Sequence, residues 1–206
     1  MKKIILLFVC VWATFSLSAQ NKEKVKGSKI VTVAQKEIGE FDNLEVSDNL
    51  EVFLIKGDKC GVEIEADDNL HDAIKVDFSE KTLTLSTNKE ISGAKKLSIR
   101  VTYTNDLKMV MANDEANITA LSPIKLNDFT FKSAGYAKIH AYVETETFTL
   151  MADDKSKLEI NLKASVATTI EMSKNASLKA LISTQKLTFD LYQKSTAAIE
   201  GDVTDL

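Results

Sequence analysis

Two carboxylates in the C-terminal half of the chain have a spacing that could bring them together. Glu171 and Asp190 are 19 positions apart, since 190 − 171 = 19, so a chain that coils with that period would place them side by side on neighbouring turns. Such a pair can act in a retaining glycosidase or bind calcium. A glycosidase also needs one acid kept protonated in a dry pocket, whereas these two are expected on an open, solvated sheet. We therefore predict no catalytic role for either residue.

A histidine has acidic and basic neighbours at a similar spacing. His140, Glu159 and Lys179 would form one column on the opposite sheet, and a lone histidine in such company is more often a surface ion pair than a catalytic or metal-binding group. His71 lies in a predicted turn, far in sequence from any cysteine or second histidine, which argues against zinc. The chain also contains no glycine-rich phosphate loop, nucleophile elbow or zinc-helix motif. We predict that the protein is not an enzyme and holds no cofactor or metal.

Threonines recur with the same period and could form a recognition surface. A ladder of hydroxyl and methyl groups on adjacent strands would be flat and exposed, but β-branched residues also simply suit exposed strands, and the second interpretation is favoured. The weak surface candidates in this column are Thr130, Thr149, Thr169 and Thr188.

The elements that must position these residues form a repeat. The apolar residue that follows each threonine recurs with spacings of 19, 20 and 19, at Phe131, Leu150, Ile170 and Phe189, after a degraded copy at Val110. Eight residues later come Ile118, Ile139, Leu158, Leu178 and Ala197, and midway lie Ala116, Ala137, Ser156, Ala176 and Ser195. A period near 20 with two strands per unit is typical of a β-solenoid, in which each turn buries its apolar face against the next. The small residues predict tight corners, and the polar triplets before them, such as Asp153-Asp154-Lys155, predict exposed turns.

The first half of the chain alternates apolar and polar residues, which predicts half-buried strands. Segments such as Leu50–Leu54 and Leu97–Tyr103 have a period of two, and turn signals such as Lys56-Gly57-Asp58 separate them. After the first residues no helical period is sustained. We predict an all-β protein whose strand-rich N-terminal half caps a solenoid with about 19–21 residues per coil.

Three segments make the chain similar to a known family. The segments that carry the resemblance are Phe41-x-x-Leu44-x-Val46, then Leu50–Leu54 leading to Gly57, and then Leu97–Tyr103 before the first coil. The chain resembles the auto-transporter adhesin head GIN domain of exported proteins of Gram-negative bacteria. The resemblance spans about Ile38 to Leu206. It implies a right-handed parallel β-helix and an adhesin-like role with an unknown ligand. Where relatives often have Ser-Gly-Ser at the corner, this chain has Ser133-Ala134-Gly135 at one corner, and the others differ.

The beginning of the chain has the pattern of a secretory signal peptide. Lys2 and Lys3 precede the apolar run Ile4–Leu17, and small residues follow up to Ala19. The run is shorter than the roughly 20 residues that span a bilayer. Cys10 is not expected to carry a lipid, because Val9 precedes it and the apolar run continues beyond it. We predict a signal peptide at 1–19, cleaved after Ala19 or after Ser18, a flexible lead-in at 20–37 and a single domain at 38–206.

Charge and composition limit the partners. The chain has 26 basic and 30 acidic residues, and without the signal peptide, which has two lysines, the balance is 24 − 30 = −6. Arg100 is the only arginine, and a nucleic-acid binder normally needs a clustered basic face. We predict an exported protein that is periplasmic, held on the outer surface or secreted. After cleavage of the signal peptide it is expected to have no transmembrane segment and to bind a surface protein or glycan. A polysaccharide-acting enzyme and a module that binds another envelope protein through an open solenoid edge are the alternatives.

Overall fold

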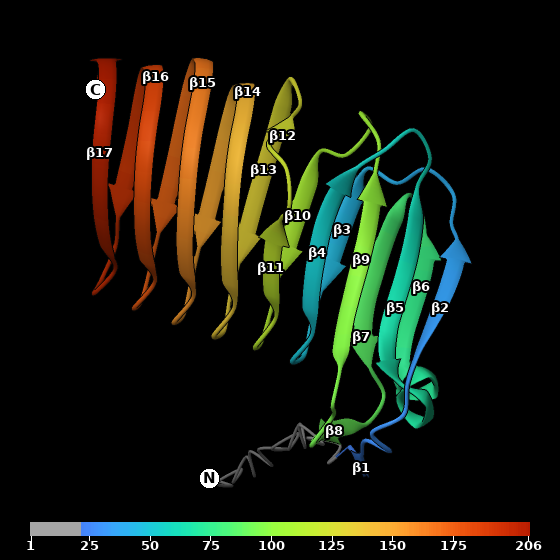
Figure 1. Ribbon diagram of the computed structural model, residues 1–206. Helices are drawn as coiled ribbons and strands as arrows, with labels where there is room; N and C mark the ends of the chain where they lie inside the picture. Colours follow the sequence, from blue (N-terminus) through green and yellow to red (C-terminus); the bar gives the residue numbers. More distant parts are fainter. Residues whose placement is uncertain (1–21) are drawn as a thin grey trace, which may run out of the picture.

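The computed structural model describes residues 22–206, whose C-terminal half is a stack of parallel strands (Figure 1). Successive coils pair in register, and the solenoid has about five turns. The strands are β10 (Met109–Ala112), β11 (Asn117–Ala120), β12 (Ile124–Lys125), β13 (Asp128–Ser133), β14 (Lys138–Ala152), β15 (Lys157–Met172), β16 (Ser177–Leu191) and β17 (Thr196–Asp205).

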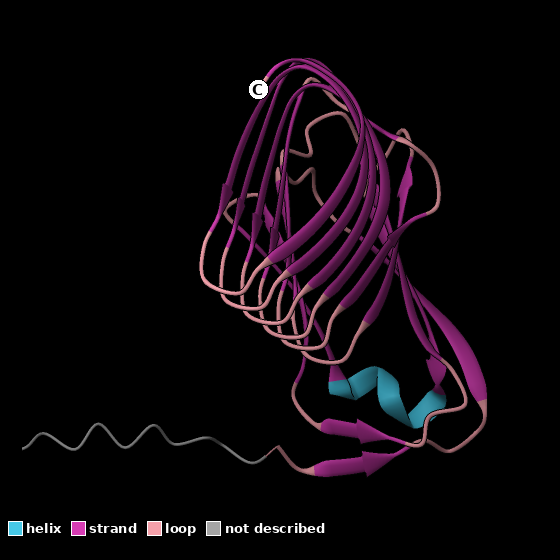
Figure 2. Ribbon diagram, turned by 90° about the vertical axis from the view of Figure 1, so that its left-hand side faces the viewer, coloured by secondary structure: helices cyan, strands magenta, loops and turns pink. Residues whose placement is uncertain are grey.

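Each long strand contributes to two sheets, because it bends at a bulge. The register shifts between Thr145 and Thr147 in β14, and the inward Thr145 hydroxyl donates to the Thr147 carbonyl at 2.9 Å across the bend. Figure 2 shows the two sheets end-on, joined by continuous strands on one side and by short loops on the other. We call the strand portions after each loop the first sheet (138–145 in β14) and those before the next loop the second sheet (147–152 in β14).

The predicted register is confirmed. Phe131, Leu150, Ile170 and Phe189 are successive partners on neighbouring coils, and Val110 extends their column as expected. The small residues of the corner column are fully buried, with Ser195 in the last coil half-buried: Ala116, Ala137, Ser156 and Ala176. Stacked apolar columns therefore form one core along the solenoid.

The corners share an unusual backbone conformation. One residue in each turn has a left-handed φ of 55–71°, a conformation that costs most L-residues roughly 1–2 kcal/mol. The residues are Asp48, Asp114, Gly135, Asp154, Lys174 and Gln193. A Cβ at Gly135 would lie 2.7–2.9 Å from the Asp114 backbone, so glycine is required there by both conformation and space.

Aspartates connect several corners along the solenoid axis. The Thr87 amide donates to Asp48 Oδ2 at 2.7 Å, the Asp48 amide to Asp114 Oδ2 at 3.1 Å, and the Gly135 amide to Asp154 Oδ2 at 3.2 Å. Each carboxylate thus accepts a hydrogen bond from a backbone N–H on the neighbouring coil, at a strand end for Thr87 and at a corner for Asp48 and Gly135. We call this series the corner ladder.

The N-terminal half continues both sheets and then closes them. β3 and β4 pair in parallel with β10 and β11, and β7 and β9 extend the two sheets. Antiparallel strands, β2 beyond β5 in one sheet and β6 in the other, finish this end. The elements are β1 (Lys24–Lys26), β2 (Val31–Glu37), β3 (Asn43–Val46), β4 (Glu51–Lys56), β5 (Gly61–Asp67), the 3-10 helix η1 (Asp68–Ala73), β6 (Ile74–Ser79), β7 (Thr82–Thr87), β8 (Glu90–Ser92) and β9 (Leu97–Tyr103).

The prediction of a flexible lead-in at 20–37 is wrong for the part that the structure describes. β1 pairs with β8 and β2 pairs with β5. The buried carboxylate of Asp67 accepts hydrogen bonds from the amides of Lys29, Lys95 and Lys96 at 2.8–3.1 Å. Burial raises the pKa of Asp67, but these amides outweigh it and leave the pKa below its ordinary value. The predicted signal peptide lies outside the described residues.

Candidate functional site

The threonine column lies on the outer face of the second sheet, as predicted. Its four members are partners on β13 to β16. Thr169 and Thr188 are exposed, and Thr130 and Thr149 are half-buried. Adjacent members are one strand spacing, about 4.8 Å, apart, so the column is a flat row of hydroxyl and methyl groups.

Glu171 and Asp190 are brought together, but they are not enclosed. The two residues are partners on β15 and β16, and both side chains are exposed to solvent. Water therefore reaches both carboxylates, and the site lacks the dry pocket that would keep one acid protonated beside an ionised partner. The geometry provides proximity without the environment that glycoside hydrolysis needs.

His140 and Glu159 lie side by side on the first sheet, as the predicted column requires. His140 Nδ1 lies 3.5 Å from Glu159 Oε2, and the two side chains are 67% and 61% exposed. Lys179 is the next member of the column. A pair this exposed contributes little to stability, and the column is a solvated surface of alternating charge.

Two shallow depressions meet on the outer face of the first sheet, at Asn161 and Leu181. One has a volume of about 550 Å³ and extends toward Glu159 and Lys179. The other, of about 360 Å³, extends toward Tyr142. Leu181 is 54% exposed where they meet. The lining residues besides these are His140, Ala141, Ile160, Leu162, Lys163, Ala180, Ile182, Ser183, Ala198, Glu200, Gly201 and Asp202.

This surface, which we call the first-sheet groove, is long and open. Enclosed pockets that bury most of a small ligand are concave and mainly apolar, whereas this groove sets polar and charged groups around one exposed leucine. A central apolar contact with a polar rim is the arrangement found where proteins contact other macromolecules. The sequence predicted the His140, Glu159 and Lys179 column but not the second column, which contains Tyr142, Asn161 and Leu181.

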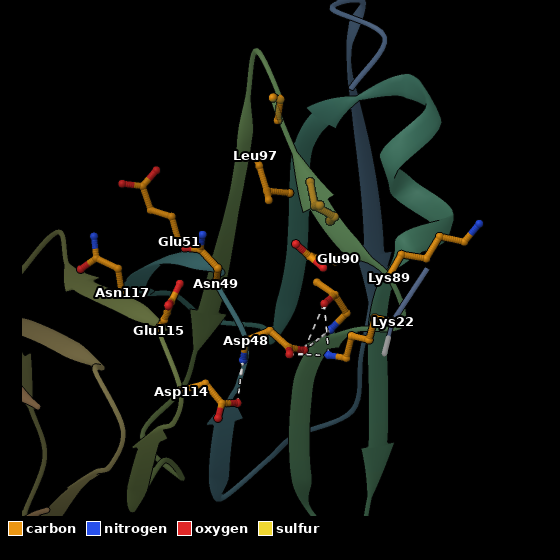
Figure 3. A pocket seen from close by; sticks show the side chains of 14 residues that line it. Lys22, Asp48, Asn49, Glu51, Lys89, Glu90, Leu97, Asp114, Glu115 and Asn117 are labelled. Atoms are coloured by element: carbon orange, nitrogen blue, oxygen red, sulfur yellow. Dashed lines mark hydrogen bonds and ion pairs between the residues drawn. The ribbon is translucent and has the colours of Figure 1, made fainter. Parts of the chain in front are cut away.

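A larger cavity lies elsewhere, between the first corners and the β1–β8 ribbon (Figure 3), and has a volume of about 850 Å³. We call it the corner cavity. Its wall is rich in carboxylates, two of which are paired with lysines: Asp48 with Lys22, and Glu90 with Lys24 at 3.3 Å. The lining residues are Lys22, Asp48, Asn49, Glu51, Thr87, Lys89, Glu90, Ile91, Gly93, Ala94, Leu97, Asp114, Glu115 and Asn117.

Asp48 shows what the corner cavity does in the fold. Burial raises the pKa of Asp48, but hydrogen bonds from the Lys22 ammonium and from Thr87 lower the pKa by more than burial raises it. The pKa of Asp48 therefore lies below its ordinary value. Its own amide donates to Asp114, as the dashed lines of Figure 3 indicate. Both aspartates therefore belong to the corner ladder. The side chains that line the cavity connect the ribbon to the solenoid. Sequence analysis missed it because its residues are far apart in the chain.

Two further structural facts bear on function. Among residues 22–206, no group of three or more His, Cys, Asp or Glu side chains is arranged to hold a metal ion. In the same part of the chain, no helix has the length and apolar character needed to cross a bilayer.

Comparison with known proteins finds a family model that matches most of the chain. Residues 40–181 match the family described as "Putative auto-transporter adhesin, head GIN domain". No curated protein matches the sequence significantly.

Three solved structures share the architecture. A "putative adhesin" from Bacteroides fragilis is 14% identical, with a TM-score of 0.60 over 86% of this chain and 100% of that chain. A "putative adhesin" from Parabacteroides distasonis is 14% identical, with a TM-score of 0.54 over 89% and 98% of the two chains. A "putative lipid binding protein" from that organism is 11% identical, with a TM-score of 0.57 over 89% and 100%. At these identities the likeness shows the fold.

Proposed function

Since the chain belongs to the auto-transporter adhesin head GIN domain family, we propose that it is an exported, non-enzymatic protein of the cell envelope or secretions that binds a surface glycan or protein. The first-sheet groove carries the proposal. It is the place where an exposed apolar side chain, Leu181, is surrounded by polar groups from four consecutive coils, β14 to β17. The family name and the names of the similar structures support an adhesin-like role.

The scaffold supports this proposal because it holds the groove rigidly. The residues of the groove stand on strands that pair along most of their length, and their inward neighbours, such as Ile160 and Ile182, are buried at 3% and 1% exposure. A preorganised surface loses little conformational entropy when it binds. The groove can thus act without rearrangement of the backbone.

A matched pair of variants tests the groove. We expect Leu181→Arg to weaken binding of the mature protein to immobilised surface glycans or surface proteins by about tenfold or more, as for a central contact residue. Thr169→Arg, the same change on the exposed face of the second sheet, should leave binding unchanged. Equal losses for both variants, or binding that neither variant affects, would place the binding surface elsewhere.

The export half of the proposal has a separate test. The signal pattern implies that protein recovered from the envelope or the medium begins at Gln20, or at Ala19 if cleavage follows Ser18. Mass spectrometry of the N-terminal peptide measures this directly. An intact Met1 terminus or a lipid on Cys10 would contradict it.

A further inference from the structure

The two ends of the solenoid are finished differently. At the N-terminal end, Lys36 of the outermost strand β2 stands opposite buried Val62, on the core-facing side of the ladder. A charge in that position discourages another strand from pairing with an edge. In β17, at the other end, the core-facing residues are uncharged and include Ile199 and Val203.

The C-terminal end also exposes core side chains. Leu191 is 44% exposed, whereas Met172, its partner in the preceding coil, is 0% exposed. Phe189 is half-buried, whereas its partner Ile170 is 1% exposed. Within residues 22–206, β17 pairs with β16 and with no other strand. This end therefore offers apolar contacts together with a row of backbone groups able to form hydrogen bonds.

Charges alternate along one outward column of the first sheet. Lys125 Nζ lies 2.8 Å from Glu144 Oε2, and Lys163 follows Glu144 on the next coil. The column ends, after Ser183, at Asp202. Opposite charges on adjacent strands attract, and each such pair contributes roughly 0.2–1 kcal/mol. The pattern favours a basic residue beyond Asp202.

Three other outward columns also end in an acid, whereas the columns that end at Thr196, Ala198 and Thr188 end in uncharged residues. Asp205 follows Lys186, Glu200 follows Leu181, and Asp190 follows Glu171 in the second sheet. A strand added beyond these residues would place alternate side chains against acids, whether it ran parallel or antiparallel. A second copy of β17 would bring the same acids against them, and like charges directly opposite one another destabilise a strand pair.

We propose that the outer edge of β17, with the adjoining edge of β16 at 187–191, binds an extended basic segment of a partner protein by strand addition. The backbone groups of β17 supply the hydrogen bonds, and the acids select lysine or arginine at alternate positions, as in other cases of strand addition. This edge adjoins the first-sheet groove, because Glu200 and Asp202 also line the groove, but strand addition does not require Leu181.

The test uses the mature protein and a short blocked peptide that alternates lysine with valine or threonine. We expect the labelled peptide to bind in fluorescence anisotropy, to protect β17 amides from hydrogen exchange, and to bind better than the same peptide with glutamate for lysine. Glu200→Lys/Asp202→Lys should weaken binding by about tenfold and shift the preference to the glutamate peptide. Glu144→Lys/Glu146→Lys, the matched reversal of two acids in an internal coil outside the groove, should change neither.

A second variant separates strand addition from simple charge attraction. Val203→Lys copies the core-facing lysine of β2 at the other edge and should abolish β17 protection for both peptides. Its folding is checked by the exchange of β14 and β15 amides, which should match the wild type. Lack of binding, binding without β17 protection, equal binding of the two peptides, or sedimentation showing β17 covered by a second copy would each overturn the proposal.

Discussion

Replacing Gly135 with alanine tests whether the corners of the solenoid are as constrained as their geometry indicates. Its φ of 71° is a left-handed conformation, which costs an alanine roughly 1–2 kcal/mol. The new Cβ would also lie 2.7 Å from the carbonyl oxygen of Asp114, and relieving such crowding typically costs about 1–3 kcal/mol. The less flexible unfolded chain of the variant offsets about 0.4–1 kcal/mol. Gly135→Ala should therefore lower the free energy of unfolding by about 1–4.5 kcal/mol.

Urea unfolding followed by circular dichroism measures this loss as a shift of the midpoint at unchanged slope. Gln193→Gly is the matched control, because Gln193 has a φ of 58° in the last corner. There glycine removes the conformational cost at the expense of a looser unfolded chain, so stability should rise by about 0.5–1 kcal/mol. A Gly135→Ala loss under about 0.5 kcal/mol, or a loss of stability in Gln193→Gly, would refute the reasoning.

Three further predictions concern the core and the chemistry. The hydroxyl of Thr168 is buried and has no hydrogen-bond partner among residues 22–206, so Thr168→Val should raise the free energy of unfolding by about 1 kcal/mol. Thr169→Val on the exposed face is the control and should change it by less than about 0.5 kcal/mol. A lower stability of Thr168→Val would show that the hydroxyl has a hydrogen-bond partner. Burial raises the pKa of Tyr103 to about 12, so above pH 10 the unfolded state releases this proton first and stability should fall by about 2 kcal/mol between pH 10 and pH 12. Tyr103→Phe should remove that part of the pH dependence, and an identical profile in the variant would contradict the assignment. The wild-type protein should hydrolyse no polysaccharide in a broad panel assayed with and without calcium, and turnover that disappears in Glu171→Gln/Asp190→Asn would establish the enzyme alternative.

The solenoid could be predicted from the sequence because its information is local and repeated. Spacings of 19, 20 and 19 between Phe131, Leu150, Ile170 and Phe189 fix the register of four coils, and every outward column follows from that register. The corner ladder could not be predicted in this way. Among the left-handed positions of the corners, Gly135 alone carries the residue type that signals the conformation, whereas aspartate, lysine and glutamine occupy the others.

The N-terminal strands were missed for a related reason. Residues 20–37 are polar and rich in lysine, the composition of a flexible segment, and the contact that holds them comes from Asp67, far along the chain. Asp67 belongs to a polar run that the sequence marks as a turn, and nothing in its neighbourhood distinguishes a turn from an anchor. The first-sheet groove was half predicted, since a column can be inferred from spacing but the depth of the surface depends on the size of neighbouring side chains.

The stacking of coils determines how the molecule responds to mechanical load. The hydrogen bonds between β16 and β17 run along the solenoid axis, so tension applied along that axis at the C-terminal end stretches the bonds of one coil at a time. Coils should then peel away in sequence, and each released coil of 19–21 residues adds about 60–70 Å of extended chain. Tension applied across the sheets would instead shear many bonds together. The protein is therefore expected to extend gradually under axial pull and to resist lateral pull strongly.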